Sequence, residues 1–384
     1  MGEYSAEYSA EYAPKYSKEY SAEYAPKYFK EYSAEYAPKY SKEYSAEYAP
    51  KYSKEYSAEY APKYSKEYSA EYCSIDNVIE KLKTDGVAVI PNIISLSKIK
   101  SYQNQLWDML NHLTQKLETP IKKDDIKTWK TIYELYPNYN MLLHRWGIGH
   151  SKLCWGIRQE QKVIDVFSHI WKVKPDELLT SFDGMSIHFP HEITKRGHYT
   201  GEDWFHTDQS QLKKDFCCVQ GMVTLFDINE GDATFRCMKK SNNFHSQFFE
   251  KYDIKSKGDW YKLNEETSSY FDKFEKCSII AEKGSLILWD SRTFHQGIES
   301  RIERKIPNIR NVIYVSMLPR NTATEYDLKK KRKAFNKKRT TSHWSNKSRL
   351  FSKLPNTCGK KLPEITNVND EIILSNIGKR LAGF

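Results

Sequence analysis

Cysteine pairs of the C-x-x-C type are missing from this 384-residue sequence, and its seven cysteines are an odd number. Neither a zinc knuckle nor a disulfide framework is therefore indicated, and a reducing compartment is expected. The sequence also lacks an apolar run of membrane-spanning length and the apolar N-terminal stretch that a signal peptide needs. We therefore expect an intracellular, cytoplasmic protein without a membrane span, and a nuclear or virion location stays open.

Valine, leucine and isoleucine are absent from residues 1–72, which repeat a 12-residue unit. Tyrosine occupies every fourth position from Tyr4 to Tyr72, so 18 of the 28 tyrosines lie here. One proline in each of five units interrupts any helix, and the lack of aliphatic side chains leaves no core. The segment is predicted to be a low-complexity tail, disordered or in broken helix. The alternative is an adhesive or cross-linking role, since Ala-Pro-Lys-Tyr resembles the repeats of byssal adhesive proteins.

Positive charge exceeds negative charge outside the repeat. Residues 3–72 contain 13 Glu and 10 Lys, and the whole chain has a net charge of +10, so the rest carries +13. Such a surface attracts anionic partners. The predicted basic C-terminal extension, residues 321–384, has its densest charge at 329–339, which could bind phosphates or direct the chain to the nucleus. A solvated helix face or flexible connection is the simpler interpretation, and Arg339–Trp344 could fold back on the domain.

The globular part of the sequence begins at Ile75 with helical patterns. A short helix is predicted after Asp76, a buried strand at Gly86–Ile90, and an amphipathic helix at Leu96–Leu117. Strands are predicted next, at Ser181–Phe189, Cys217–Ile228, Ala233–Met238, Cys277–Ala281, Ser285–Trp289 and Ile309–Leu318.

This order of elements predicts an α+β fold over residues 73–320. Its centre would be a double-stranded β-helix, a barrel of the jelly-roll or cupin type, with helices at the N-terminal side. The segment Phe244–Lys276 reads as helix and loop inserted between strands. Surface packing is the simpler role for such an insertion, and a lid is the alternative.

Two histidines and an aspartate are candidates for a metal site. His206 and Asp208 lie on a predicted extended segment, where alternate residues face the same side, and His295 follows a buried strand. Two imidazoles and one carboxylate can hold one face of an octahedral Fe(II) and leave positions open for oxygen and a co-substrate. Arg310, at the start of a late strand, could bind a carboxylate. A zinc hydrolase could use the same ligands but would not need that arginine. The other alternative is that the histidines are hydrogen-bonded core residues that bind no metal.

The motifs around these residues are Asp203–Gln209, Cys218–Gly221, Gly231–Thr234, Lys240–Asn242 and Gly284–Trp289, with His295 and Arg310. Together, over residues 75–319, they resemble the phytanoyl-CoA dioxygenase superfamily, and within it the giant-virus and algal members. The resemblance implies that His206, Asp208 and His295 are the catalytic iron ligands and that Arg310 binds the distal carboxylate of 2-oxoglutarate. It also implies that O2 and 2-oxoglutarate are consumed, that succinate forms, and that an unidentified small molecule or peptide is hydroxylated.

Four further residues are interpreted as contacts of the ligands or the co-substrate, namely Trp204, Gln209, Gln220 and Ser181. Packing is the alternative for them. The loop Gln296–Ile309 is longer than in the family and contains Arg301, an alternative to Arg310 that the strand context disfavours. Two other functions stay open: a nucleic-acid- or surface-binding protein with an inactive oxygenase fold, and an adhesive in which the repeat is functional.

Overall fold

A computed structural model describes residues 67–135, 141–256, 258–304, 306–355, 359 and 361–384. Most of the predicted tail therefore lies outside the described residues. Residues 67–355 and 363–384 belong to one compact unit, which contains the sheets, the helices and the candidate site. The predicted domain boundary at residue 72 stays a prediction, and the last residues of the repeat already pair with strands of this unit.

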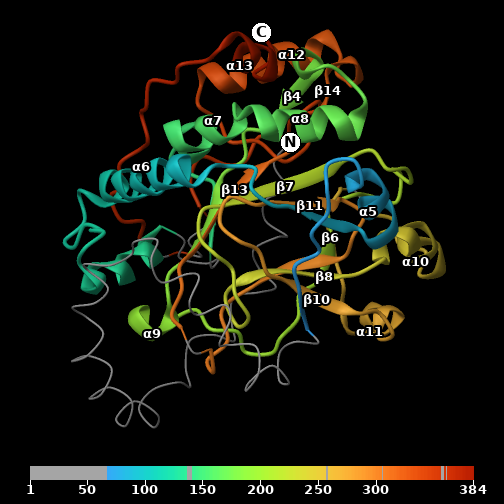
Figure 1. Ribbon diagram of the computed structural model, residues 1–384, viewed down its shortest axis with the longest axis horizontal. Coiled ribbons are helices and arrows are strands. Elements are labelled where there is room, and N and C mark those ends of the chain that lie inside the picture. Colours follow the sequence, from blue (N-terminus) through green and yellow to red (C-terminus); the bar gives the residue numbers. More distant parts are fainter. Residues whose placement is uncertain (1–66, 136–140, 257, 305, 356–358, 360) are drawn as a thin grey trace. The chain divides into compact units, whose positions relative to one another are not determined.

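Two six-stranded sheets form the centre of this unit (Figure 1). The first sheet, in spatial order, contains β1 (Tyr68–Ser69), β10 (Lys276–Ile279), β8 (Thr234–Met238), β12 (His295–Ile298), β6 (His206–Thr207) and β9 (Tyr261–Lys262). The second sheet contains β2 (Val87–Ile90), β11 (Leu286–Asp290), β7 (Val219–Thr224), β13 (Arg310–Val315), β5 (Met185–His188) and β3 (Leu142–Leu143). A separate pair joins β4 (Leu178–Thr180) to β14 (Met317–Pro319).

Strand direction and chain path agree with the predicted fold class. All pairs in the two sheets are antiparallel except β1 with β10. From β5 to β8 and again from β10 to β13, each successive strand lies in the other sheet. The protein is thus a mixed α+β structure on large antiparallel sheets, consistent with a jelly roll.

Side chains on β13 alternate between the two faces of the second sheet. Val312 packs with first-sheet residues such as Phe235, whereas Ile313 packs with the helices. Arg310 lies two residues before Val312 on the same strand and therefore on the face turned towards the first sheet. A charged side chain is thus placed among apolar residues between the sheets.

Helices cover the other face of the second sheet (Figure 1). They are α5 (Val78–Asp85), α6 (Leu96–Thr114), α7 (Lys152–Arg158) and α8 (Gln161–Trp171). The predicted helix from Leu96 is confirmed, and its apolar stripe is buried. The helices α7 and α8 were not predicted. The helix α7 has only 7 residues, too few for a helical period to be recognised. No described helix is both long and apolar enough to cross a lipid bilayer.

The remaining helices lie between or beside these layers. The α-helices are α9 (His191–Thr194), α10 (His245–Lys251), α11 (Glu265–Ser268), α12 (Glu325–Asn336) and α13 (Asn376–Leu381). The 3₁₀ helices are Ile126–Glu134, Ile148–His150, Pro175–Glu177, Ser241–Phe244, Ser269–Phe271 and Arg320–Thr322. Residues 244–276 build an aromatic cluster in which Phe271 lies 5.2 Å from Phe248 and 4.4 Å from Phe294, measured between ring centroids. The insertion is therefore packed against the domain, as the simpler interpretation expected.

The basic C-terminal segment is a helix that packs on the domain. On α12, Leu328, Lys331 and Ala334 are buried. The Lys331 ammonium donates to the carbonyl oxygens of Thr180 and Ser345. The segment is thus a helix and not a flexible connection; Lys329 and Lys333 lie on its exposed face, as the solvated-face interpretation expected, and Lys331 lies on its buried side. Anion binding through residues 329–339 stays a prediction, to which Lys331 cannot contribute.

Two buried histidines make stability depend on pH. Burial lowers the pKa of His150 and of His188 to about 3, whereas in the unfolded chain each titrates near 6.5. Between these values the unfolded state binds more protons, so stability falls as the pH falls, by about 1.4 kcal/mol per pH unit for each histidine. Urea unfolding of the metal-free protein between pH 7 and 4.5 should show this loss. An unfolding free energy that stays constant over that range would contradict it.

Candidate metal centre

The three predicted ligands meet at the neighbouring strands β6 and β12 of the first sheet. His206 on β6 and His295 on β12 are directly opposite in register. Asp208 Oδ2 lies 3.9 Å from His206 Nε2 and 3.4 Å from His295 Nε2. One ligand atom from each residue falls within 4.8 Å of the other two. The donor set and its spacing therefore fit a single metal ion.

Asp208 does not lie on the strand that sequence alternation predicted, because β6 ends at Thr207. Its position is fixed by hydrogen bonds. The Asp208 backbone N–H donates to the carbonyl of Ser291 over 3.1 Å, and the Gln220 side-chain amide donates to Oδ2 over 2.9 Å. Gln220 thus directly contacts a candidate ligand and orients its carboxylate.

The ring of His295 is oriented by the backbone. Its Nδ1 lies 2.9 Å from the carbonyl oxygen of Thr293, so Nδ1 carries the proton and donates it. Nε2 then keeps its lone pair on the side of Asp208. This is the tautomer that a metal ligand requires.

The protonation states also suit a divalent cation. Burial, with a contribution from His295, lowers the pKa of His206 to about 3, so the imidazole is neutral near pH 7. Burial alone would raise the pKa of Asp208, but its interactions with the side chains of His295 and His206 outweigh burial and lower it. The site thus offers a carboxylate and a neutral imidazole without loss of a proton.

Aromatic rings surround the ligands. Trp204 stacks on His206 with 4.8 Å between ring centroids and 11° between planes, and its Nε1 donates to the Gly297 carbonyl over 3.0 Å. Phe235 stacks on His295 at 5.2 Å. The ring centroid of Trp260, which belongs to the insertion at residues 244–276, lies 5.8 Å from that of His206. These rings limit water around the ligands, although Trp204 itself remains 40% exposed.

Arg310 lies between the sheets with its guanidinium buried. Its side chain is adjacent to Met222, with Nη2 3.7 Å from the sulfur, and its Nε has no hydrogen-bond partner among the described residues. Burial lowers the pKa of Arg310, and Tyr314 opposes this shift. No acidic side chain in the described part of the chain forms an ion pair with it. A buried cation without a counter-ion is suited to bind an anion.

The strand β7 connects Arg310 to the three ligands. Gln220 and Met222 lie two residues apart on β7 and face the same side. The first contacts Asp208 and the second contacts Arg310. Two residues along a strand span roughly 7 Å. A short dicarboxylate is therefore of the right size to reach from the ligands to the guanidinium.

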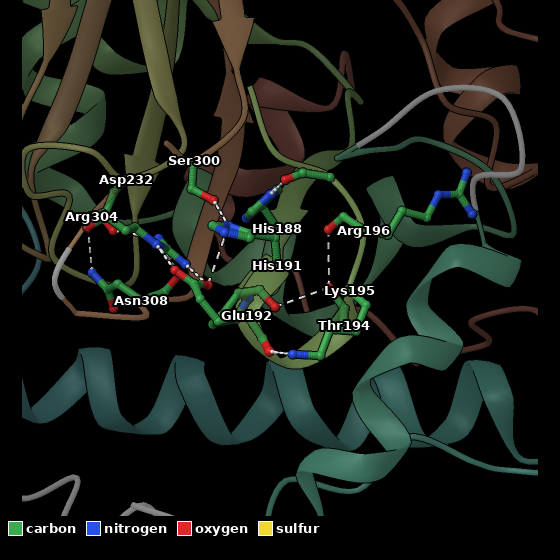
Figure 2. Close-up of polar contacts among 12 residues, drawn as sticks. His188, His191, Glu192, Thr194, Lys195, Arg196, Asp232, Ser300, Arg304 and Asn308 are labelled. Atoms are coloured by element: carbon green, nitrogen blue, oxygen red, sulfur yellow. Dashed lines mark hydrogen bonds and ion pairs between the residues drawn. The ribbon is translucent and has the colours of Figure 1, made fainter. Parts of the chain in front are cut away.

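Arg301, the alternative to Arg310, and Arg304 in the same loop already have acidic partners. Arg301 pairs with Glu67 at 2.8 Å. Arg304 pairs with Glu192 at 2.7 Å and with Asp232 at 2.6 Å, in the network that Figure 2 shows. Neither guanidinium is as available to a carboxylate ligand as that of Arg310.

Gln209 and Ser181, which were predicted to contact the ligands or the co-substrate, bind other parts of the chain. The Gln209 amide donates to the carbonyls of Lys213 and Asp215, over 2.6 and 2.8 Å, and so holds the loop after the first ligands. Ser181 Oγ accepts from the Ser316 backbone N–H over 3.1 Å. Neither contacts the three ligands in the described residues, and a role of either in co-substrate binding stays a prediction.

Sequence reasoning missed several residues that shape the site. Ser291, Thr293 and Phe235 orient or pack on the ligands through their backbone or ring, which no sequence motif signals. His343, from the C-terminal segment, also lowers the pKa of His206 and of Asp208, by less than their other partners do. The segment Arg339–Trp344 was noticed in the sequence, but without a role.

Comparison with known proteins gives one curated relative of moderate similarity. The chain is 28% identical over 269 residues to "Ava biosynthesis cluster protein O" of Aspergillus versicolor, which covers 67% of this chain and 82% of the relative. No protein-family model matches the chain.

A solved structure shares the fold, and a second one is similar at a lower TM-score. The hypothetical protein JW0805 of Escherichia coli is 13% identical, covers 82% of this chain and 85% of its own, and superposes with a TM-score of 0.50. The epimerase SnoN, solved in complex with Fe3+, alpha ketoglutarate and nogalamycin RO, is 7% identical with a TM-score of 0.39 and covers 64% and 84% of the two chains. At 13% identity, the similarity to the E. coli protein shows a common fold and does not show an activity.

Proposed function

We propose that this chain is an Fe(II)- and 2-oxoglutarate-dependent dioxygenase that hydroxylates an organic substrate. The observation that carries the proposal is the pairing of a two-histidine, one-aspartate group with a buried arginine that lacks an acidic partner among the described residues. A structural zinc site would not require that arginine. The sheets would then correspond to the double-stranded β-helix of the phytanoyl-CoA dioxygenase superfamily, and the likeness to giant-virus and algal members stays a prediction.

Each residue has a separate task in this proposal. His206, Asp208 and His295 would hold Fe(II), which supplies the oxidation chemistry: O2 is consumed, 2-oxoglutarate yields succinate and CO2, and one oxygen atom enters a C–H bond of the substrate. Arg310 would bind the distal carboxylate of 2-oxoglutarate. Gln220 would keep Asp208 oriented.

The substrate is proposed to be a small organic molecule. The curated relative is named for a biosynthesis cluster, which supports a metabolite over a macromolecule. Trp204 and Trp260 line the ligand side of the site with apolar surface, which also suits a small, partly apolar molecule.

Anaerobic titration tests the proposal directly. Adding 2-oxoglutarate to the Fe(II)-loaded protein should produce a visible charge-transfer absorption band that saturates at one equivalent. The Zn(II)-loaded protein is the control and should give no band, since Zn(II) is a closed-shell ion without redox chemistry. Absence of the band at saturating Fe(II) and 2-oxoglutarate would refute the function.

A further inference from the structure

The last six residues of the N-terminal repeat are built into the folded domain. Residues 67–72, with the sequence Glu-Tyr-Ser-Ala-Glu-Tyr, include β1, which lies at the edge of the first sheet and runs parallel to β10. The carbonyl oxygens of the first, third and fifth residues of this hexapeptide accept from the backbone N–H groups of Ser278, Ile280 and Val89, over 2.6, 3.0 and 3.0 Å. These bonds fix the register of the hexapeptide on the domain.

Both glutamates of the hexapeptide meet cations of the domain. The Glu71 side chain is buried, and its carboxylate lies 2.5 Å from the Lys81 ammonium and 2.8 Å from the Lys239 ammonium. Burial alone would raise the pKa of Glu71, but hydrogen bonds from Lys239 and Lys81 lower it to about 2, so the carboxylate is charged near pH 7. The first glutamate, Glu67, pairs with Arg301 at 2.8 Å. The docking site therefore selects negative charge at the first and fifth positions.

The tyrosines and the serine of the hexapeptide make further contacts. Tyr68 is buried, and the Tyr72 hydroxyl accepts from the Glu282 backbone N–H over 3.0 Å. The Ser69 hydroxyl donates to the Glu71 carboxylate over 2.7 Å and so helps to orient it. Backbone hydrogen bonds that give affinity, combined with side-chain contacts that give specificity, are typical of peptide recognition by strand addition. The site thus recognises a sequence as well as an extended backbone.

The same hexapeptide occurs six more times in the chain, all before residue 67. The copies are residues 3–8, 7–12, 19–24, 31–36, 43–48 and 55–60. The other hexapeptides of the repeat with tyrosine at the second and sixth positions, such as Glu-Tyr-Ala-Pro-Lys-Tyr, have lysine at the first or the fifth position. That lysine would face Arg301 or the pair Lys81 and Lys239, and like charges disfavour binding. A chain whose own residues 67–72 fill its site therefore has six further copies that match the same site.

We propose that this site accepts a Glu-Tyr-Ser-Ala-Glu-Tyr segment from a second copy of this chain in place of residues 67–72, and that chains are linked through their repeats in this way. The exchange replaces one set of contacts by an identical set, as in domain swapping. The tether of the chain's own segment favours that segment, with an effect equivalent to a local concentration that is roughly millimolar. Association is therefore expected to rise with chain concentration. The inference is independent of the candidate metal centre and of the proposed function.

A full-length host chain without an intact hexapeptide tests the exchange. The host carries a glutamine at the fifth position of every copy, through the substitutions Glu7→Gln, Glu11→Gln, Glu23→Gln, Glu35→Gln, Glu47→Gln, Glu59→Gln and Glu71→Gln. Glutamine has nearly the same size but no charge, so the host's own segment should bind the site about 10-fold or more weakly than the intact one. In analytical ultracentrifugation, the fluorescently labelled host should therefore sediment faster after the wild-type chain is added.

Two controls assign the complex to this site. Unlabelled host, added in place of the wild-type chain, should leave the sedimentation of the labelled host unchanged. A labelled host that also carries Lys81→Ala and Lys239→Ala should no longer respond to the wild-type chain. A complex that persists in either control would show that chains associate through other contacts of the repeat, and it would overturn the inference. A folded host that forms no complex with the wild-type chain would overturn it as well.

A peptide titration decides the question even if the host is unstable. The free peptide Glu-Tyr-Ser-Ala-Glu-Tyr, with both ends blocked, stands for the segment of the second chain. Because a ligand of the native state stabilises it, the peptide should raise the Tm of the host, or refold the host where it is unfolded, as followed by circular dichroism. The peptide Glu-Tyr-Ser-Ala-Gln-Tyr should need at least about 10-fold higher concentration for the same effect. Equal effects of the two peptides, or no effect of either, would contradict the proposal.

Discussion

Asp208→Ala should lower the affinity for Fe(II) by about 100-fold or more and abolish succinate formation from 2-oxoglutarate. Asp208 supplies the only negative charge of the three ligands, and its hydrogen-bond network fixes the carboxylate between the two imidazoles. Changes even in the partners of metal ligands cost roughly 10–100-fold in affinity, so loss of the carboxylate itself costs at least as much. Anaerobic Fe(II) titration and NMR detection of succinate measure the two effects.

A nearby acid provides the control for this substitution. Asp215 is exposed in the same loop, and only its backbone carbonyl is used in holding Gln209. Asp215→Ala should therefore bind Fe(II) and form succinate as the wild type does. Retention of tight Fe(II) binding by Asp208→Ala would show that the three residues do not share one ion.

Arg310→Leu should weaken 2-oxoglutarate binding by about 100-fold, which corresponds to about 3 kcal/mol, and leave Fe(II) binding unchanged. The guanidinium is buried, so its charge acts on a carboxylate with little screening by water. Leucine fits apolar surroundings such as Met222 and Val312. Because no acidic partner among the described residues is left behind, the unliganded protein should lose no stability. Titration of the Fe(II) protein with 2-oxoglutarate and a thermal melt give both values.

Arg301→Ala is the matched control, since it removes the arginine that the sequence offered as the alternative. Its partner is Glu67, so the substitution should change 2-oxoglutarate affinity by less than about twofold, in line with the small energies of exposed ion pairs. Equal losses from Arg301→Ala and Arg310→Leu would contradict the assignment to Arg310.

Long apolar patterns made the fold largely predictable from the sequence. The strands at Ser285–Trp289 and Ile309–Leu318 were predicted close to the observed β11 and β13, because both are buried on two faces and read as nearly continuous apolar runs. The two-residue strand β6 and the short helix α7 have too few residues to show a period. Their existence depends on tertiary contacts, which local sequence does not encode.

The candidate site shows the same division. We could predict His206, Asp208 and His295 as metal ligands because their spacing and the motifs around them are visible in the sequence. The surroundings of Gln209 and His343 could not, since each is decided by which distant segment packs against it.

Residues 340–345 are held on the domain by hydrogen bonds between Thr341 and Phe182 and between Lys331 and Ser345, which has a consequence for biosynthesis. The ribosome synthesises the chain from its N-terminus, so both sheets can assemble before residues 340–345 have been made. Until then Trp344 has not covered Cys218, and the loop after Asp208 lacks its packing partner. Nascent or prematurely terminated chains that end near residue 320 would therefore contain every candidate metal ligand and still lack the packing of Trp344 against Cys218 and Lys213.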